Sequence, residues 1–264
     1  KWILFNSESP VHSEKYEDVI LDQINWFMSY RTDSDIYVPY GSVIPCDNKW
    51  QNENLFDGKT RNVAWIVSNC HLKSKREEYV KELVKYIDVD VFGKCGTNYC
   101  PRNDSCYQML EKKYKFYLSF ENSFCKDYVT EKLFQYIQYD MIPVVYGSAN
   151  YSQIMPKNSY INTADFGSPQ ELANHLKEIS SDKQKYNSYM NWKNNYCVQI
   201  THYKYFCNLC EKLNVDSDRK STNRWTKSKF TEAQPINTYM DHECTKYVEY
   251  VIRANGTNNF DDKN

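Results

Sequence analysis

The chain has 264 residues, a length that suits one large domain or two smaller ones. Hydrophobic residues make up 41% and charged residues 25% of the sequence, which is enough apolar material for a packed core and excludes a fully disordered chain. The formal net charge is -1, so the sequence lacks the basic excess that nucleic-acid-binding domains usually carry. No stretch reaches the roughly 18 to 20 apolar residues of a membrane helix, and the printed chain is therefore expected to be soluble.

The first strand is expected at once, because Trp2-Ile3-Leu4-Phe5 follows Lys1 without any lead-in. A start of this kind indicates a processed or truncated chain and leaves open a signal or anchor that preceded it. The stretch 46–61 is polar and has no helical or strand period, which is typical of an interdomain connection. Residues 1–57 are therefore interpreted as the remnant of an N-terminal domain and its linker.

Strand and helix patterns alternate through the central region, in the manner of βαβ units. The capping-box pairs Ser74/Glu77 and Ser168/Glu171 each predict a helix start, and another helix is expected at 130–139. The inward-facing residues of these helices should be Val80, Leu83, Val84, Ile87, Leu133, Phe134, Ile137, Leu172, Leu176 and Ile179. Strands are expected at 62–68, 89–92, 116–120 and 142–146.

This alternation predicts an α/β domain with a parallel sheet over residues 58–215. After it the chain becomes polar and aperiodic, and residues 216–264 are expected to form a largely disordered tail. The sequence shows no internal repeat of 20 to 50 residues.

Ten cysteines are many for a cytosolic enzyme of this size, and they indicate an oxidising compartment, although their pairing cannot be read from the sequence. Three Asn-x-Ser/Thr sequons, at Asn103, Asn150 and Asn255, are candidate glycosylation sites and agree with that interpretation. Cys207 and Cys210 could form half of a zinc site, but no second pair has a suitable spacing. Disulfides and a secretory-pathway protein are therefore predicted.

Two clusters at the predicted carboxyl edge of the sheet suit a phosphorylated ligand. Arg76 lies in the first turn of a predicted helix, where free N–H groups, the helix dipole and a guanidinium together favour a diphosphate. Glu131 and Lys132 open the helix after the 116–120 strand, where Glu131 can accept hydrogen bonds from sugar hydroxyls and Lys132 can neutralise a phosphate. From these residues alone, an exposed Arg on a solvated helix is the simpler interpretation of Arg76, whereas Glu131 and Lys132 can equally be an ordinary solvated helix start.

A third cluster, Glu8-Ser9-Pro10 with His12, follows the first strand. A carboxylate on such a loop can act as general base for a sugar hydroxyl if burial raises its pKa, and His12 is the rival base. A surface acid remains the simpler interpretation of a single loop carboxylate.

Metal-binding and nucleotide-binding loops are not favoured by the sequence. Asp-x-Asp, a metal motif in some sugar-nucleotide enzymes, occurs at 33–35, 88–90 and 216–218, which shows how readily the pattern arises. With 7 Gly in the chain, no Gly-x-Gly-x-x-Gly, Walker loop or Gly-x-Ser-x-Gly is present.

Taken in order, these segments resemble the inverting α1,3-fucosyltransferases that use GDP-fucose, glycosyltransferase family 10. The similarity is most specific at 114–123 (YKFYLSFENS) and 127–133 (DYVTEKL), and it covers residues 2–213. Other matching segments are Glu8-Ser9-Pro10 with His12, Asn25-Trp26, Ser29-Tyr30-Arg31, Asp33-Ser34-Asp35, Val38-Pro39-Tyr40-Gly41, Val63-Ala64-Trp65, Ser68-Asn69 and Pro143-Val144-Val145.

The resemblance implies a GT-B fold with two Rossmann-like domains, the N-terminal one truncated here. It implies a donor site in the C-terminal half and an acceptor site in the N-terminal half, with Glu8 as the catalytic base. The donor-site residues of the family correspond to Arg76, Asn122, Tyr128, Glu131 and Lys132. Arg76 and Lys132 would stabilise the charge on departing GDP.

The resemblance also implies no required cofactor or metal, with a divalent cation at most stimulatory, and GDP-fucose and a glycan as partners. Family members are type II proteins of the Golgi, and the membrane anchor and stem that they carry are missing ahead of Glu8. Cys207 and Cys210 match a pair that bridges, in relatives, to cysteines in that missing region.

Two departures from the family pattern are Gln135-Tyr136-Ile137, where Asn-Ala is usual, and Asp140, where Gly is common. Both are expected to affect helix packing more than donor contacts. The cysteines between Cys95 and Cys106 resemble those of invertebrate core-type members. The prediction is therefore an α1,3-fucosyltransferase of glycoprotein N-glycans, with the innermost GlcNAc slightly preferred over N-acetyllactosamine. The alternatives are another GT-B sugar-nucleotide transferase and a secreted carbohydrate-binding pseudoenzyme of this fold.

Overall fold

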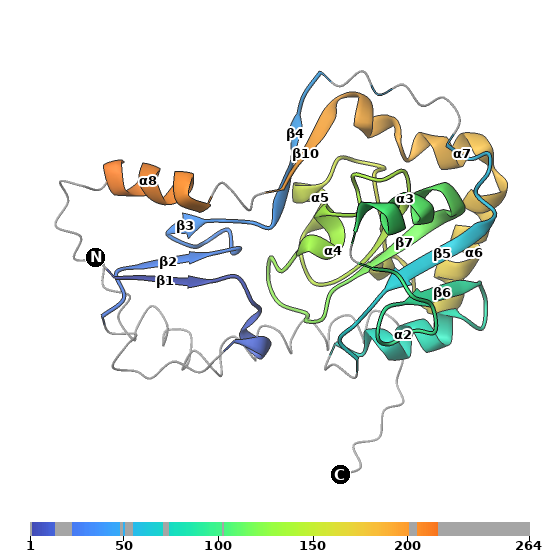
Figure 1. Cartoon of the computed structure of the whole chain (residues 1–264), viewed down its shortest axis with the longest axis horizontal. Coiled ribbons are helices and arrows are strands. Elements are labelled where there is room, and N and C mark those ends of the chain that lie inside the picture. Colours follow the sequence, from blue (N-terminus) through green and yellow to red (C-terminus); the bar gives the residue numbers. More distant parts are fainter. Residues whose placement is uncertain are drawn as a thin grey trace, which may run out of the picture.

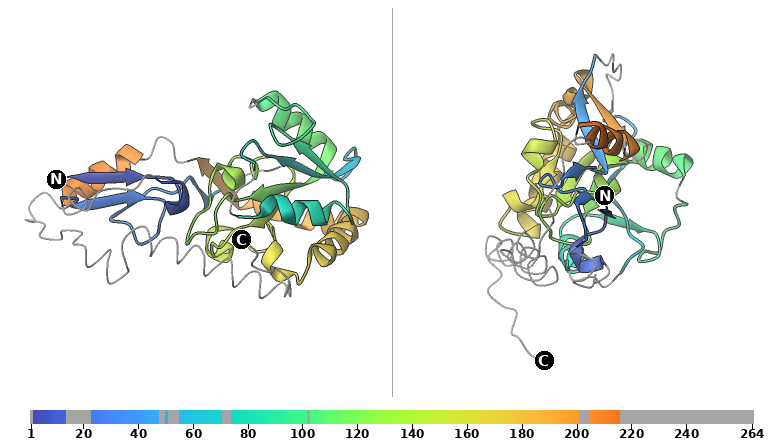
Figure 2. Two further views of the ribbon diagram at one scale, coloured as in Figure 1. Left: turned by 90° about the horizontal axis from the view of Figure 1, so that it is seen from below. Right: turned by 90° about the vertical axis from the view of Figure 1, so that its left-hand side faces the viewer.

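The computed structural model describes residues 2–13, 23–47, 50, 55–70, 74–101, 103–200 and 205–215. Figure 1 shows a small sheet with a helix beside it and a larger lobe built around a five-stranded sheet, with a two-stranded ribbon between them. The same division is visible from below in Figure 2. Parallel sheets connected by helices confirm the predicted α/β class.

The small sheet is entirely parallel and has β2 at its centre. Its strands are β1 (Ile3–Asn6), β2 (Trp26–Ser29) and β3 (Ile36–Tyr37). The core on one face of it consists of Trp26, Met28, Ile36 and Val38. Tyr205 and Leu209 of α8 (Tyr205–Val215) pack against this core, and Asn208 Nδ2 donates a hydrogen bond of 2.8 Å to the Tyr37 carbonyl. The last described helix thus contacts the N-terminal sheet, because an amphipathic helix packs wherever its apolar face finds a partner.

The ribbon between the lobes pairs β4 (Gly41–Pro45) antiparallel with β10 (Tyr196–Ile200). Neither strand was predicted, since each is short and its partner lies far away in the sequence. A Cβ on Gly41 would lie 2.4 Å from Cγ of Phe134, so a side chain at this position would clash with the helix that carries Phe134. Glycine therefore lets β4 lie directly against the larger lobe.

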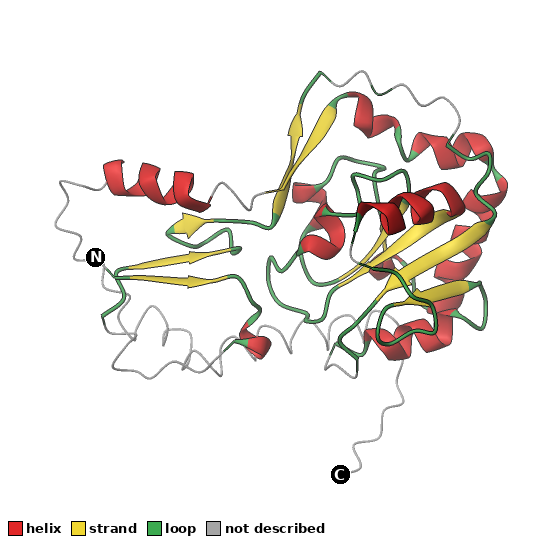
Figure 3. Cartoon of the chain, in the orientation of Figure 1, coloured by secondary structure: helices red, strands yellow, loops and turns green. Residues whose placement is uncertain are grey.

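The large sheet is parallel throughout, in the order β6-β5-β7-β8-β9. Its strands are β5 (Arg61–Ile66), β6 (Val89–Phe92), β7 (Tyr114–Phe120), β8 (Ile142–Tyr146) and β9 (Ile161–Asn162). The α-helices of this lobe are α2 (Arg76–Leu83), α3 (Asp104–Lys113), α4 (Glu131–Phe134), α5 (Tyr151–Ile154), α6 (Pro169–Ser181) and α7 (Lys183–Ser188). Short 3-10 helices lie at Pro10–His12 (η1), Thr163–Asp165 (η2) and Asn191–Asn194 (η3), as Figure 3 shows by colour.

Helices cover both faces of this sheet. Phe116 and Leu118 of β7 belong to one core with residues of α2 and α6, while Tyr117 belongs to another core with residues of α3. Burial on both faces explains the almost continuous apolar runs of the strands. Exposed polar side chains that could serve a function are therefore expected on the loops at the ends of the strands.

Most of the predicted elements are confirmed. Strands occur within or overlapping all the expected ranges, and Ser168 caps α6 by accepting a hydrogen bond of 3.2 Å from the Glu171 N–H. The helix expected at 130–139 is shorter, because α4 ends at Phe134 and turns follow, although Leu133 and Ile137 are buried as expected. None of the described helices is long and apolar enough to cross a membrane.

The Ser74/Glu77 capping box is wrong. The N-cap of α2 is Lys75, whose φ of 53° is left-handed and moves the helix start one residue beyond Ser74. Ser74 is buried, and its hydroxyl has no hydrogen-bond partner among the described residues. Val84 follows the end of the helix and is 46% exposed, so it does not share the buried face of Val80.

Disulfides confirm the prediction made from the cysteine content. The described residues contain the pairs Cys46–Cys197, Cys70–Cys95 and Cys100–Cys106. Within the same residues Cys207 and Cys210 are unpaired and exposed on α8. The predicted tail at 216–264 and the sequon at Asn255 lie outside the described residues.

Removing the Cys46–Cys197 disulfide should destabilise the protein strongly, because this bond joins positions 151 residues apart. We expect the double substitution Cys46→Ser/Cys197→Ser to lower the free energy of unfolding by about 2–4 kcal/mol, measured in denaturant without reductant. Cys100→Ser/Cys106→Ser is the matched control, because its pair is separated by 6 residues and closes a much shorter loop. An equal loss from both pairs would contradict this account.

Candidate active site

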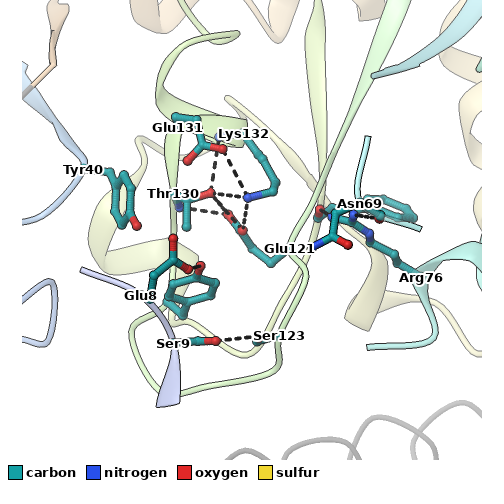
Figure 4. Close-up of polar contacts among 12 residues, drawn as sticks. Glu8, Ser9, Tyr40, Asn69, Arg76, Glu121, Ser123, Thr130, Glu131 and Lys132 are labelled. Carbon is teal, nitrogen blue, oxygen red and sulfur yellow. Dashed lines mark hydrogen bonds and ion pairs between the residues drawn. The ribbon is translucent and has the colours of Figure 1, made fainter. Parts of the chain in front are cut away.

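A cavity of about 460 Å³ lies at the carboxyl edge of the large sheet, beside the loop that follows β1. Its walls come from the loops after β1, β5 and β7 and from the first turns of α2 and α4. Figure 4 shows the polar side chains that gather here from both lobes. Ligands of open α/β sheets bind at this edge, so the cavity is the candidate active site.

Glu8 enters the cavity from the loop after β1. Its carboxylate is exposed and accepts a hydrogen bond of 3.2 Å from the Tyr128 hydroxyl, and its backbone N–H donates to Asn6 Oδ1 at 2.9 Å. The burial that was named as a condition for a general base is therefore not present at Glu8. His12, the rival base, is exposed in η1 and does not line the cavity.

Two contacts fasten the Glu8 loop to its surroundings. The hydroxyls of Ser9 and Ser123 are 2.8 Å apart and buried, which joins this loop to the one after β7. The Tyr40 hydroxyl donates a hydrogen bond of 2.6 Å to the Ser7 carbonyl, and Tyr40 itself lines the cavity. Glu8 is thus positioned by both lobes.

Tyr128 forms part of the cavity wall next to Glu8. Its ring packs edge-on against Tyr30, with 5.0 Å between centroids, and the side chain is buried. Burial raises the pKa of Tyr128 well above its ordinary value, and nearby carboxylates such as Glu121 raise it further. The hydroxyl therefore stays protonated and donates to Glu8.

Glu121, which follows β7 directly, is a fully buried carboxylate behind the cavity wall. It accepts hydrogen bonds from the Thr130 N–H at 2.8 Å and from the Thr130 hydroxyl at 2.9 Å. Its Oε2 also lies 3.3 Å from Nζ of Lys132, forming the ion pair shown in Figure 4. Glu121 therefore holds both the N-cap of α4 and the cation that lines the cavity.

Lys132 lies in the first turn of α4, as predicted, and faces the cavity. Burial opposes its charge, but the carboxylates of Glu121 and Glu131 outweigh burial, and the pKa of Lys132 lies above its ordinary value. Glu131 is exposed, with its Oε1 3.3 Å from Lys132 Nζ. The cation is thus permanently charged at neutral pH.

Arg76 is 2% exposed and lines the cavity at the start of α2. Its Nη1 donates to the Phe120 carbonyl at 2.9 Å, and its Nη2 donates to the Asn69 carbonyl at 2.8 Å. The side chain therefore ties together the loops that follow β5 and β7. A guanidinium has more N–H groups than these contacts use, so Arg76 can still donate to a bound anion.

Asn122 also lines the cavity, and its Oδ1 is buried without a hydrogen-bond partner among the described residues. A buried acceptor of this kind costs free energy unless a ligand donates to it. Gln135 and Tyr136 line the cavity as well. The departure at these two positions thus lies at the cavity wall, and the expectation that it affects helix packing more than donor contacts stays a prediction.

The cavity brings together Glu8, Arg76, Asn122, Tyr128, Glu131 and Lys132. Sequence reasoning did not single out Glu121, Thr130 or Tyr40. Thr130 could have been found as a typical N-cap residue one position before the first turn. Glu121 and Tyr40 act through contacts with distant or separate segments, which leave no local pattern.

Two of the three Asp-x-Asp motifs are engaged in other contacts, and the third, at 216–218, lies outside the described residues. The Arg31 guanidinium donates to Asp33 and lowers the pKa of that carboxyl to about 2, and Asp90 forms an ion pair of 2.7 Å with Arg61. Within the described part of the chain, His, Cys, Asp and Glu side chains form no group of three or more that could hold a metal.

The buried carboxyl of Glu121 predicts a pH-dependent stability. Burial raises the pKa of Glu121 above its unfolded value of 4.5, and the Lys132 charge opposes this rise only in part. A raised pKa in the folded protein means that the protonated group stabilises the fold at low pH, and that this contribution is lost as the pH rises through the folded pKa. Glutamine resembles the protonated form at every pH.

We therefore expect the free energy of unfolding of Glu121→Gln, relative to that of the unsubstituted protein, to be higher at about pH 7 than at about pH 4. Urea unfolding of both proteins at the two pH values measures the difference. Glu131→Gln, at an exposed position in the first turn of α4, is the control. A penalty for Glu121→Gln that is the same at both pH values would show that burial does not govern this carboxyl.

Two family models match the chain. Residues 56–228 match glycosyltransferase family 10 (fucosyltransferase) C-term, and residues 1–41 match fucosyltransferase, N-terminal. Glycoprotein 3-alpha-L-fucosyltransferase A of Drosophila melanogaster is 39% identical over 232 residues, which cover 84% of this chain and 45% of that protein. Alpha-(1,3)-fucosyltransferase C of the same species is 39% identical over 214 residues, covering 73% and 50%. The chain thus spans about half the length of these curated relatives.

Solved structures share the fold. A crystal structure of an α1,3-fucosyltransferase with GDP-fucose has a TM-score of 0.59 at 14% identity, covering 83% of this chain and 75% of that chain. A crystal structure of an α1,3-fucosyltransferase with GDP has a TM-score of 0.57 at 16% identity, covering 80% and 74%. These likenesses confirm the predicted GT-B type fold. Since the C-terminal family model alone matches residues 56–228 of 264, the chain belongs to glycosyltransferase family 10, the fucosyltransferases.

Proposed function

We propose that this chain is the catalytic part of an inverting α1,3-fucosyltransferase, which moves L-fucose from GDP-fucose to a GlcNAc of glycoprotein N-glycans. One observation carries the proposal: a single cavity is lined by the Glu8 carboxylate and by the Arg76 and Lys132 cations. The names of the Drosophila relatives and the GDP-fucose in a structure of the same fold support it.

In this proposal Glu8 is the general base. It takes the proton from the acceptor hydroxyl while that oxygen forms a bond to C1 of fucose. The bond between C1 and the diphosphate oxygen breaks, and its electron pair leaves with GDP. A single displacement inverts the anomeric centre, so a β-linked donor yields an α-fucoside.

The cations stabilise the leaving group. Lys132 and Arg76 would offset the negative charge that grows on the GDP β-phosphate, and charge-assisted hydrogen bonds in a site without water are strong. The Oδ1 of Asn122, which has no hydrogen-bond partner among the described residues, would accept a hydrogen bond from the nucleoside. Tyr128 and Glu131 would contact the donor beside Lys132.

The exposure of Glu8 is compatible with a general base whose carboxylate is shielded from water only when the substrates bind. Glu8 is an exposed residue, and its side chain accepts the hydrogen bond from Tyr128. Bound donor and acceptor would exclude water from the carboxylate and strengthen its basicity. Tyr128 would orient one carboxylate oxygen and leave the other for the acceptor proton.

The preferred acceptor is the innermost GlcNAc of an N-glycan, ahead of an outer N-acetyllactosamine. The cysteine cluster that resembles core-type members supports this choice, and in the structure it contains the Cys100–Cys106 disulfide. The proposed location is the Golgi lumen, as part of a type II membrane protein. The three disulfides of the described residues agree with an oxidising lumen. The reaction as proposed requires no metal, although a divalent cation can stimulate it.

The test is GDP release from GDP-fucose with two acceptors, a core N-glycan glycopeptide and N-acetyllactosamine. The assay uses this chain and a version extended at its N-terminus. Faster turnover with the core glycopeptide is the expected result, and faster turnover with N-acetyllactosamine would reassign the acceptor. GDP binding without turnover in either version would favour a carbohydrate-binding pseudoenzyme.

A further inference from the structure

A second cavity, of about 500 Å³, lies in the larger lobe beside the edge strand β9. It shares no lining residue with the candidate active site. The aromatic rings of Tyr160, Phe166 and Tyr189 line it together with the polar side chains of Asn158 and His175. Aromatic rings stack on the C–H face of a pyranose, and nearby amides and ring nitrogens bind its hydroxyls, so this lining suits a sugar.

A glycosylation sequon adjoins this cavity. Ser152, the third residue of Asn150-Tyr151-Ser152, lines it, and the ring of Tyr151 lies 5.8 Å from that of Tyr160. Asn150 is exposed at the N-cap of α5. The Ser152 hydroxyl donates a hydrogen bond of 2.7 Å to Asn150 Oδ1, which leaves Nδ2 as the atom that can carry a glycan.

We propose that Asn150 carries an N-linked glycan and that the inner GlcNAc residues of this glycan occupy the cavity beside β9. The inference rests on the proposed secretory-pathway location. A sugar attached two residues from the wall of the cavity is present there at a high effective concentration, so weak stacking on Tyr189 and Phe166 is enough to hold it. The glycan would cover the exposed edge of β9, where another chain could otherwise pair.

Asn103 provides an internal comparison. It is exposed at the N-cap of α3, where its Oδ1 accepts hydrogen bonds from the Ser105 hydroxyl at 2.8 Å and the Cys106 N–H at 3.1 Å. Neither Asn103 nor Ser105 lines either of the two cavities described above. A glycan on Asn103 should therefore extend into solvent without a site on the protein.

The first part of the test is glycopeptide mapping of this chain secreted from insect cells. We expect glycan on Asn150, and occupancy of Asn103 reports independently that the chain has passed the glycosylation machinery. Glycan on Asn103 with none on Asn150 would overturn the inference and leave the secretory location intact. Complete absence of glycan from the secreted chain would also overturn the inference.

The second part tests the cavity by thermal unfolding. Ser152→Ala removes the sequon but keeps Asn150, while Ser152→Thr keeps the sequon and controls for the change at Ser152. We expect Tyr189→Ala to lower the melting temperature by about 2–4 °C more in the glycosylated protein than in the Ser152→Ala background. Phe166→Ala is the second variant, in case Tyr189→Ala does not fold. An equal effect in both backgrounds would show that the glycan does not occupy this cavity.

Discussion

Replacing Glu8 with glutamine is expected to lower turnover by roughly 100-fold or more, while GDP-fucose still binds. Glutamine has nearly the shape of glutamate and can accept the hydrogen bond that the Tyr128 hydroxyl now donates to Glu8 at 3.2 Å. It cannot take up the proton of the acceptor hydroxyl. Steady-state kinetics with the glycopeptide acceptor and calorimetric titration with GDP measure the two properties separately.

His12→Gln is the control for this experiment. His12 lies on the same loop as Glu8, but it is exposed and does not line the cavity, so its replacement should leave turnover almost unchanged. Normal turnover in Glu8→Gln, together with a large loss in His12→Gln, would transfer the role of base to the histidine. Loss of GDP binding in Glu8→Gln would instead show that the carboxylate acts in donor binding.

Replacing Lys132 with alanine is expected to weaken GDP-fucose binding by about 10-fold to 100-fold, since a charged hydrogen bond contributes about 1.5–3 kcal/mol. Lys132 lines the cavity, and the neighbouring carboxylates hold its pKa above the ordinary value, so it presents a full charge to the diphosphate. Lys126→Ala is the matched control, because Lys126 pairs with Asp33 and does not line the cavity. Unchanged donor affinity in Lys132→Ala would assign the phosphate contact to another residue.

The same substitution has a second consequence, because it removes the ion-pair partner of the buried Glu121. A buried carboxylate that loses its cation destabilises the fold. Adding Glu121→Gln to Lys132→Ala should therefore restore stability without restoring donor affinity. Recovery of both stability and donor affinity would mean that Lys132 affects the donor only through the local structure. This double-mutant cycle therefore separates donor binding by Lys132 from its structural role.

The elements of the larger lobe could be predicted because their signals are local. The strands at 116–120 and 142–146 are almost continuous apolar runs, as expected where helices cover both faces of a sheet. Ser168 and Glu171 are close in sequence, and the same pair forms the cap of α6 in the structure. The candidate site residues were found on the loops after these strands and in the first turns of the helices.

Contacts between distant segments could not be predicted from the sequence. Pairing of β4 with β10 and packing of α8 on the small sheet depend on where the chain returns after the whole larger lobe. The capping box at Ser74 failed for a related reason, since the left-handed backbone of Lys75 belongs to the loop that leads to the site. The residue types around position 75 do not show that Lys75 adopts a left-handed backbone conformation.

The sequence by itself thus determined the α/β class, the order of the main strands, the need for disulfides and the loops that carry the candidate site. The tertiary structure alone decided how these loops meet: the exposure of Glu8, its contact with Tyr128, and the burial of Glu121 against Lys132. Local periodicity reports which side of a segment is buried. The protonation and orientation of a site residue depend instead on the neighbours that the fold brings to it from other parts of the chain.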